Sequence, residues 1–418
     1  QVAYDTRRLA RLPPALISAS SIPNPTGGHQ AAMAYPAQPV TNIGIKPRTV
    51  DLVWRRLGYP STEVWRHVHS ATVNSGVSAG SPAPTYSSPE ERLAVARGRM
   101  RAGAFPGNHL DDPPEEPLMK LYMDFAGPTA VASHIHGYRH YCGVTGGYSG
   151  LTRVYGCRAP TAAVAVYALQ QFLIYARVLL KSAIPVTPIV VRTDQGAAFT
   201  SAVFAEYIRS LSAELSLAVV YTPQQNSPIE RAWGSIFYTA RILLYLSNLS
   251  PVWHSFAIYQ ATLLRNIWPV VEKKISRHQI FTGGSVPDVK WLRAFGCAVE
   301  AYLGKEQRYS ADRKRDVPLG KKLVDHAAAG IYLGSAYPTP GHVVYFLKAR
   351  TIRACVHVAF DETSFPGIPD TPLESDTDLQ VTNRDKAAPQ SPPAAPKLMP
   401  AVDLLAPPSF VLQPPPVI

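Results

Sequence analysis

The chain has 418 residues, which at about 150 residues per domain predicts two or three domains. Hydrophobic residues make up 46% of it, a share that argues against a globally disordered protein. The 41 Lys and Arg residues exceed the 29 Asp and Glu residues, and the net charge of +12 favours nucleic acid as a partner ahead of a membrane surface.

The four cysteines form no Cys-x-x-Cys pair, which argues against a disulfide scaffold or a cysteine zinc finger and favours a reducing compartment. The chain begins at Gln1 with no charged-then-apolar leader, as expected for a piece cut from a longer polypeptide. The cysteines are Cys142, Cys157, Cys297 and Cys355.

The first predicted elements are a helix and three strands. Residues 1–50 lack sustained periodicity and are expected to be a disordered leader, whereas the apolar spacing over 51–68 is helical. Apolar and polar residues alternate from Leu118 to Phe125, which predicts a half-buried strand. Two further strands, 138–144 and 151–157, flank a Gly-rich turn and predict a hairpin.

A long helix is predicted over 161–181. Gln170, Gln171 and Arg177 interrupt its apolar stretch, which favours an amphipathic core helix over a membrane span. Strands and helices in this order describe a mixed α/β sheet domain. The remaining elements of this part are a buried strand at 189–191, a helical pattern over 203–211 and a strand over 217–221.

The second half begins with a helical pair over 228–268 and continues with a β-rich segment at 295–361, whose length suits a small barrel. Its clearest strands are 343–347 and 355–360. Thirteen of the 53 residues from Pro366 onward are proline, which predicts a semi-extended linker.

Three carboxylates stand at the ends of predicted elements. Asp194 follows the strand at 189–191, Asp124 lies near the end of the first strand, and Glu230 opens a helix. Functional groups collect at the carboxyl ends of strands in open α/β sheets. Together the three residues could hold two Mg²⁺ ions, which stabilise the attacking and leaving oxygens of a phosphoryl transfer.

Each carboxylate also has a structural interpretation. Ser227, Pro228 and Glu230 match a capping box, in which Ser227 precedes the helix. Asp194 is an ordinary turn residue before Gln195-Gly196, and Asp124 can simply end a strand. Taken singly, each residue fits these roles better than catalysis.

The spacing of the carboxylates changes that balance. There are 35 residues between Asp194 and Glu230. The string at 222–226 precedes Glu230, and Glu230 itself begins the string at 230–231. The pattern resembles the integrase of copia-type LTR retrotransposons, whose core carries Asp…Asp-x35-Glu on an RNase H-like fold. Further strings resemble those of the family's SH3-like barrel: Leu292-Arg293-Ala294-Phe295-Gly296-Cys297, Gly330-Ile331-Tyr332-Leu333-Gly334 and Val358-Ala359-Phe360-Asp361-Glu362.

The resemblance implies a fold and a reaction. The fold is an RNase H-like mixed five-stranded sheet with flanking helices, followed by a small SH3-like β-barrel. In the reaction a cDNA 3′-hydroxyl attacks a target phosphodiester, with Asp124, Asp194 and Glu230 as ligands of Mg²⁺ or Mn²⁺. The implied regions are a leader at 1–50, a degenerate zinc region at 51–114, a catalytic core at 115–270, a barrel at 286–362 and a proline-rich linker at 363–418.

The resemblance also implies partners and a location. The partners are the element's cDNA ends, target DNA, further copies of the chain and the protease and reverse transcriptase of the same polyprotein, with no membrane. The location is a virus-like particle in the cytoplasm and then the nucleus.

The chain departs from the family in its N-terminal zinc site. Trp54-Arg55-Arg56-Leu57-Gly58-Tyr59-Pro60-Ser61 resembles the first half of a His/Cys site, but Arg55 and Tyr59 stand where the two histidines belong. Arg92 and Val95 occupy the places of the two cysteines. Zinc is therefore not expected to bind, and a region that folds on zinc is expected to be loose without it.

Two other groups of residues drew a functional interpretation. His134, His136 and His140 could form a metal site, but a surface loop is the preferred interpretation. Arg231, beside Glu230, is a candidate phosphate contact. A basic stretch is either a solvated loop or a site of phosphate contact, with little specificity as a nuclear signal. Its residues are Lys305, Arg308, Arg313, Lys314, Arg315, Lys321 and Lys322.

Two alternatives stay open. One is a different RNase H-like enzyme, a transposase or a nuclease, against which the strings at 292–297 and 358–362 argue. The other is an inactive or domesticated remnant that binds DNA without cutting it. The intact triad argues against the remnant, and the erased zinc site argues for it.

Overall fold

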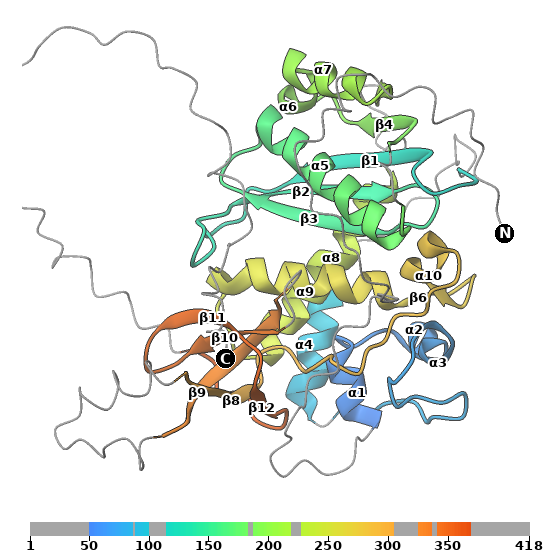
Figure 1. The fold of residues 1–418 in the computed structure, drawn as a ribbon. Helices are drawn as coiled ribbons and strands as arrows, with labels where there is room; N and C mark the ends of the chain where they lie inside the picture. Colours follow the sequence, from blue (N-terminus) through green and yellow to red (C-terminus); the bar gives the residue numbers. More distant parts are fainter. Residues whose placement is uncertain are drawn as a thin grey trace, which may run out of the picture.

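A computed structural model describes residues 50–86, 88–99, 114–182, 187–218, 227–304, 325–336 and 341–368. One five-stranded sheet lies in the upper part of the molecule and a second one at the lower left, with two long helices between them and the N-terminal helices at the lower right (Figure 1). The predicted leader, most of the predicted linker and the basic stretch at 305–322 lie outside the described residues.

The first sheet has the strand order β3-β2-β1-β4-β5. β1, β2 and β3 are antiparallel, whereas β4 and β5 run parallel to β1. This is the predicted mixed sheet with the strand order of an RNase H-like fold. Its last strand ends where the predicted strand at 217–221 was expected to begin. The strands are β1 (Lys120–Ala126), β2 (His140–Gly146), β3 (Thr152–Cys157), β4 (Val190–Thr193) and β5 (Glu214–Leu217).

Helices cover one face of this sheet. α5 (Ala162–Leu179) begins after the N-cap Thr161, whose hydroxyl accepts a hydrogen bond from the Val164 amide. It is long and apolar enough to cross a membrane. One side of it, including Leu169 and Phe172, is nevertheless packed into the core beside the sheet, as predicted for a core helix. The shorter α6 (Ala197–Thr200) and α7 (Ala202–Ser210) lie beside it (Figure 1).

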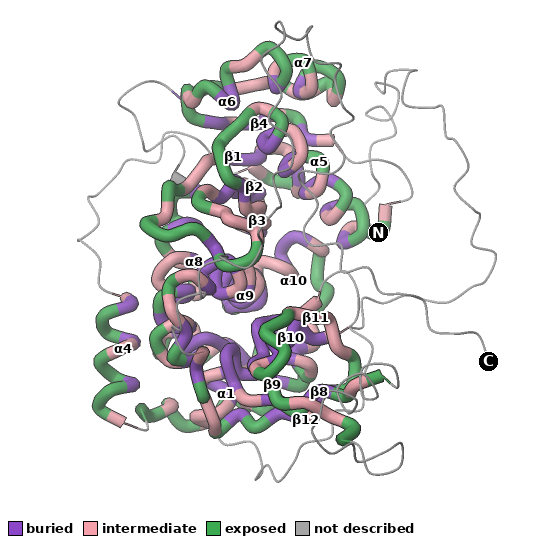
Figure 2. The backbone as a smooth tube through the Cα atoms, turned by 90° about the vertical axis from the view of Figure 1, so that its left-hand side faces the viewer, coloured by how far each residue is buried: buried purple, intermediate pink, exposed green. Residues whose placement is uncertain are grey.

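Two long helices join the halves of the molecule. α8 (Ser227–Leu246) packs against β1 and β2, and α9 (His254–Ile267) packs against α8, β3 and the second sheet. Figure 2 shows α8 and α9 between the upper and lower parts of the molecule, with buried stretches along them. After them come the short strands β6 (Pro269–Val270) and β7 (Ile275–Ser276) and the helix α10 (Arg277–Thr282).

The second sheet is antiparallel throughout, with the order β11-β10-β9-β8-β12. Tyr332, Val344 and Phe360 are buried in its own small core. The predicted β-rich segment is confirmed, but the predicted strand at 355–360 is split in two. The SH3-like barrel stays a prediction. The strands are β8 (Ala298–Tyr302), β9 (Ala327–Ser335), β10 (His342–Phe346), β11 (Thr351–Cys355) and β12 (Val358–Asp361).

The N-terminal region is packed, so the expectation that it would be loose is wrong. Trp54, Leu57 and Trp65 are buried in the same core as α8 and α9. The predicted helix at 51–68 is broken, because Gly58 and Tyr59 adopt φ angles of 67° and 58°, which end a helix. The helices are α1 (Val50–Arg56), α2 (Thr62–Trp65), α3 (Val68–Ala71) and α4 (Pro89–Arg99).

A hydrogen-bonded cluster links α1 to α4 at the positions of the expected zinc ligands. One carboxylate oxygen of Glu91, Oε1, accepts a hydrogen bond from Arg55 Nε at 3.0 Å and another from the Tyr59 hydroxyl at 2.7 Å. Glu91 is buried, and burial followed by its charge raises the pKa of Tyr59. Val95 lies in the core and Arg92 is exposed. Arg55 and Tyr59, which stand at the family's two histidine positions, are therefore linked by the carboxylate of Glu91.

Glu91→Ala is expected to lower the free energy of unfolding by about 2 kcal/mol, because Arg55 and Tyr59 lose a buried charged acceptor. The control Arg92→Ala removes an exposed side chain from the same helix and should change stability by less than about 0.5 kcal/mol. Urea unfolding measures both. Wild-type stability should not respond to a chelator, and a loss of stability in EDTA would contradict the zinc-free interpretation.

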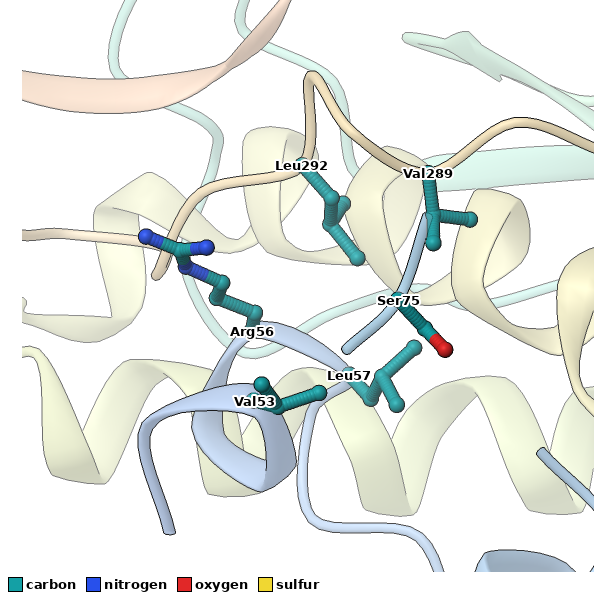
Figure 3. A pocket seen from close by; sticks show the side chains of 6 residues that line it. All are labelled: Val53, Arg56, Leu57, Ser75, Val289 and Leu292. Atoms are coloured by element: carbon teal, nitrogen blue, oxygen red, sulfur yellow. The ribbon is translucent and has the colours of Figure 1, made fainter. Parts of the chain in front are cut away.

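A buried ion pair fastens α1 to the end of the second sheet. The guanidinium of Arg56 pairs with the carboxylate of Glu362, which is 0% exposed and also accepts the Ala294 amide at 2.9 Å. Arg293 Nε lies 4.0 Å from the same carboxylate. The pocket beside this pair is lined by Val53, Arg56, Leu57, Ser75, Val289 and Leu292 and has room for about one water molecule (Figure 3).

Candidate active site

Two aspartates lie side by side at one edge of the first sheet. β1 and β4 are parallel neighbours, and Tyr122 is paired with Arg192. Asp124 and Asp194 each follow that pair by two residues, so they reach the same point along the sheet and extend from the same face. The carboxyl ends of the two parallel strands therefore bring these carboxylates together.

Glu230 reaches the same place from a helix. It lies in the first turn of α8, a helix that packs on β1 and β2. α8 already includes Ser227, whereas the capping-box prediction placed Ser227 before the first helical residue. A carboxylate in the first turn is favoured by the helix dipole. That effect explains an acidic residue here but not its proximity to Asp124.

The pKa of Asp124 reports the crowding of negative charge. Burial raises it, and the charge of Asp194 and, more weakly, that of Glu230 raise it further, to about 6. Hydrogen bonds from the Phe125 amide and the Trp233 indole act in the opposite direction. Burial also raises the pKa of Glu230, and the Arg231 charge opposes that rise. The charges of both other carboxylates thus act on Asp124, and a bound cation would offset that repulsion.

The donor set suits a hard divalent cation, because it offers carboxylate oxygens and no sulfur. Within the described part of the chain, however, no group of three His, Cys, Asp or Glu residues lies close enough together to hold a metal ion. The charges of Asp194 and Glu230 nevertheless act on Asp124, so the three carboxylates lie in one region of the molecule without forming a ready metal site.

Asp194 also makes the turn contact that its structural interpretation predicted. Its Oδ1 accepts the Gly196 amide at 3.0 Å, just before α6. Asp194 is exposed, so its second oxygen can reach solvent or a ligand. The turn role and a ligand role are therefore compatible.

Trp233 is a site residue that the sequence analysis did not find. Its indole Nε1–H donates a hydrogen bond to Asp124 Oδ2 at 3.1 Å. It lies three residues after Glu230, a spacing that places two side chains on one helix face. That spacing was the available signal, but it gives no sign that the indole would contact a residue on β1.

The remaining candidates are less informative. Arg231 is exposed on α8 next to Glu230. His134 and His136 lie in the connection between β1 and β2, where their rings contact Trp253 and Tyr138. His140 begins β2 and so belongs to a strand rather than to a loop. The seven basic residues at 305–322 lie outside the described residues.

Comparison with known proteins finds relatives of part of the chain. No family model matches the chain. It is 29% identical to the Pro-Pol polyprotein of simian foamy virus type 3 (strain LK3) over 171 residues, which are 41% of the chain and 14% of that polyprotein. It is 32% identical over 124 residues, 29% of the chain, to 9% of the retrovirus-related Pol polyprotein from transposon TNT 1-94 of Nicotiana tabacum. The chain resembles the integrase region of a Pol polyprotein.

The predicted resemblance to a Pol integrase region is thereby confirmed. The chain matches about a seventh of the length of the foamy virus polyprotein. Among solved structures, the HTLV-2 integrase catalytic core domain in complex with magnesium overlaps 40% of this chain and 97% of its own, at 22% identity and a TM-score of 0.31.

Proposed function

We propose that the chain joins the 3′ ends of element cDNA to target DNA as a metal-dependent polynucleotidyl transferase. The observation that supports this most is the meeting of Asp124 and Asp194 at the ends of parallel strands, with the charge of Glu230 acting on Asp124. The similarity to Pol polyproteins supports the same reaction class.

In this proposal Asp124, Asp194 and Glu230 hold Mg²⁺ or Mn²⁺. When bound, the metal would stabilise the attacking 3′-oxygen and the leaving oxygen of the target phosphodiester. The protein's own part is to keep the three carboxylates ionised and fixed in place, and to leave the outer side of the exposed Asp194 open for DNA. Arg231 is proposed as a phosphate contact beside Glu230.

A strand-transfer assay on the purified chain tests the proposal. The reaction contains duplex oligonucleotides that mimic cDNA ends, a supercoiled plasmid and Mg²⁺ or Mn²⁺. The expected products are plasmids with one or two joined ends. Cleavage without joining would favour the nuclease alternative, and binding without either reaction would favour the inactive remnant.

The N-terminal region supports the inactive remnant less than its sequence alone indicated. Its erased zinc site suggested a decaying region. Arg55, Tyr59 and Glu91 instead form a hydrogen-bonded cluster at that place, and the surrounding helices are packed. Loss of the metal ligands therefore does not imply loss of the fold.

DNA binding is proposed to depend on the basic stretch 303–322, which carries a surplus of four positive charges. Replacing Arg313, Lys314 and Arg315 with Ala is expected to flatten the slope of log affinity against log salt by roughly 2–3 units, because each phosphate contact contributes about 0.9. Affinity should fall about equally on all sequences. Fluorescence anisotropy at several salt concentrations measures the slope, and an unchanged slope would make the stretch a solvated loop.

A further inference from the structure

We propose that Trp233 is a positioning residue that holds the Asp124 carboxylate in the orientation needed for metal binding. The proposal rests on the proposed function, because it takes Asp124 to be a metal ligand. It adds a group that does not touch the metal or the DNA and acts through Asp124.

The geometry that carries this proposal is a direct contact. The Trp233 indole is buried, with 6% of its surface exposed, and its single N–H donor is used on Asp124 Oδ2 at 3.1 Å. An Asp carboxylate turns easily about its last torsion angle, because that torsion has broad minima. A donor fixed on Oδ2 restricts this rotation and so holds the carboxylate in one orientation.

The fold reserves space for the indole in this position. Gly143 on β2 is paired with Asp124 across the sheet. A Cβ atom added at Gly143 would lie 2.6 Å from Trp233 Cζ2 and 2.9 Å from Ile229 Cδ1, closer than real Cβ contacts allow. Glycine at this position therefore lets the indole lie against the sheet beside the carboxylate.

The indole is also held from its own helix. The ring of Phe237, one turn further along α8, stacks on it with 5.5 Å between ring centroids. Glu230 lies one turn earlier on the same helix. One face of α8 thus supplies a proposed ligand, a donor to a second proposed ligand and the ring that restrains the donor.

Partners that orient a metal ligand typically change metal affinity by 10–100-fold when removed. Trp233→Phe keeps an aromatic ring over Gly143 and removes only the N–H and the fused ring. In the full chain without DNA, its Mn²⁺ affinity by isothermal titration calorimetry is expected to be about 10-fold weaker than that of wild type. This readout does not depend on catalytic activity.

Trp268→Phe is the matched control. It removes another buried indole N–H, which donates to the Leu57 backbone carbonyl at 2.9 Å and not to a carboxylate. It should cost stability without changing Mn²⁺ affinity. A merely structural role for Trp233 predicts the same behaviour for both variants.

Gly143→Ala tests the contact without changing any group on the carboxylates. The new methyl group would displace the indole, so Mn²⁺ affinity should fall as it does in Trp233→Phe. Weaker binding in Asp194→Asn with unchanged binding in Trp233→Phe and Gly143→Ala would overturn this inference and leave the proposed site intact. Mn²⁺ binding that is insensitive to all three variants would overturn both.

Discussion

Asp194→Asn is expected to reduce strand transfer by about 10³-fold or more and to leave affinity for duplex DNA within about twofold of wild type. The amide keeps the size of the carboxylate and loses the charge that holds a divalent cation, and a loss of about 4 kcal/mol of transition-state stabilisation corresponds to this factor. The turn contact from the Gly196 amide to Oδ1 can persist, because an amide oxygen is also an acceptor.

Glu206→Gln is the control for Asp194→Asn. Glu206 is exposed on α7 and carries the same change of charge on the same half of the molecule. Strand transfer and DNA binding should both be unaffected by it. If Asp194→Asn lost DNA binding and kept chemistry on short substrates, Asp194 would belong to DNA recognition and the catalytic assignment would be wrong.

Glu362→Gln is expected to lower the free energy of unfolding by about 3–5 kcal/mol. Glu362 is fully buried between Arg56 and Arg293, which are 5% and 2% exposed. Removing one partner of a buried ion pair leaves an uncompensated charge, and that penalty exceeds the value of the pair itself. Urea unfolding followed by circular dichroism measures the change.

The same reasoning supplies two controls. Glu300→Gln makes the same change at an exposed position on β8 and should alter stability by less than about 0.5 kcal/mol. In the double variant Arg56→Met with Glu362→Gln, the loss of unfolding free energy should be smaller than the sum of the two single losses. Neither member of the pair then remains as a buried charge without its partner. Additive losses would show that Arg56 and Glu362 do not stabilise each other.

Local patterns were sufficient to predict the framework of the catalytic sheet. Alternation gave β1, the Gly-rich turn gave the β2–β3 hairpin, and a short apolar run followed by Asp194 gave β4 and its carboxyl end. Each of these signals lies within a few consecutive residues, so it can be recognised from the local pattern of apolar and polar residues. The break after α1 was missed because the helical apolar spacing over 51–68 continues across it, although Gly58 and Pro60 are local helix-ending signals.

The contacts that tune the site could not be predicted in this way. Trp233 and Asp124 are 109 residues apart, and Arg56 and Glu362 are 306 apart. Glu91 on α4 accepts hydrogen bonds from Arg55 on α1 and from Tyr59 in the turn that follows α1. These partners are selected by the packing of whole elements, which no spacing within one element specifies.

The length of α8 has a mechanical consequence for the active site. Glu230 lies in its first turn, whereas Ile242 near its other end fills the space over Gly98, at 2.4 Å from a Cβ added there. Just past the end of α8, Ser247 packs against Gly296. A Cβ atom added at Gly296 would lie 2.0 Å from the Cβ atom of Ser247. The 20 residues of α8 form a helix about 30 Å long. A larger side chain at Gly98 or Gly296 would therefore have to push against the far end of the same helix that carries Glu230 in its first turn.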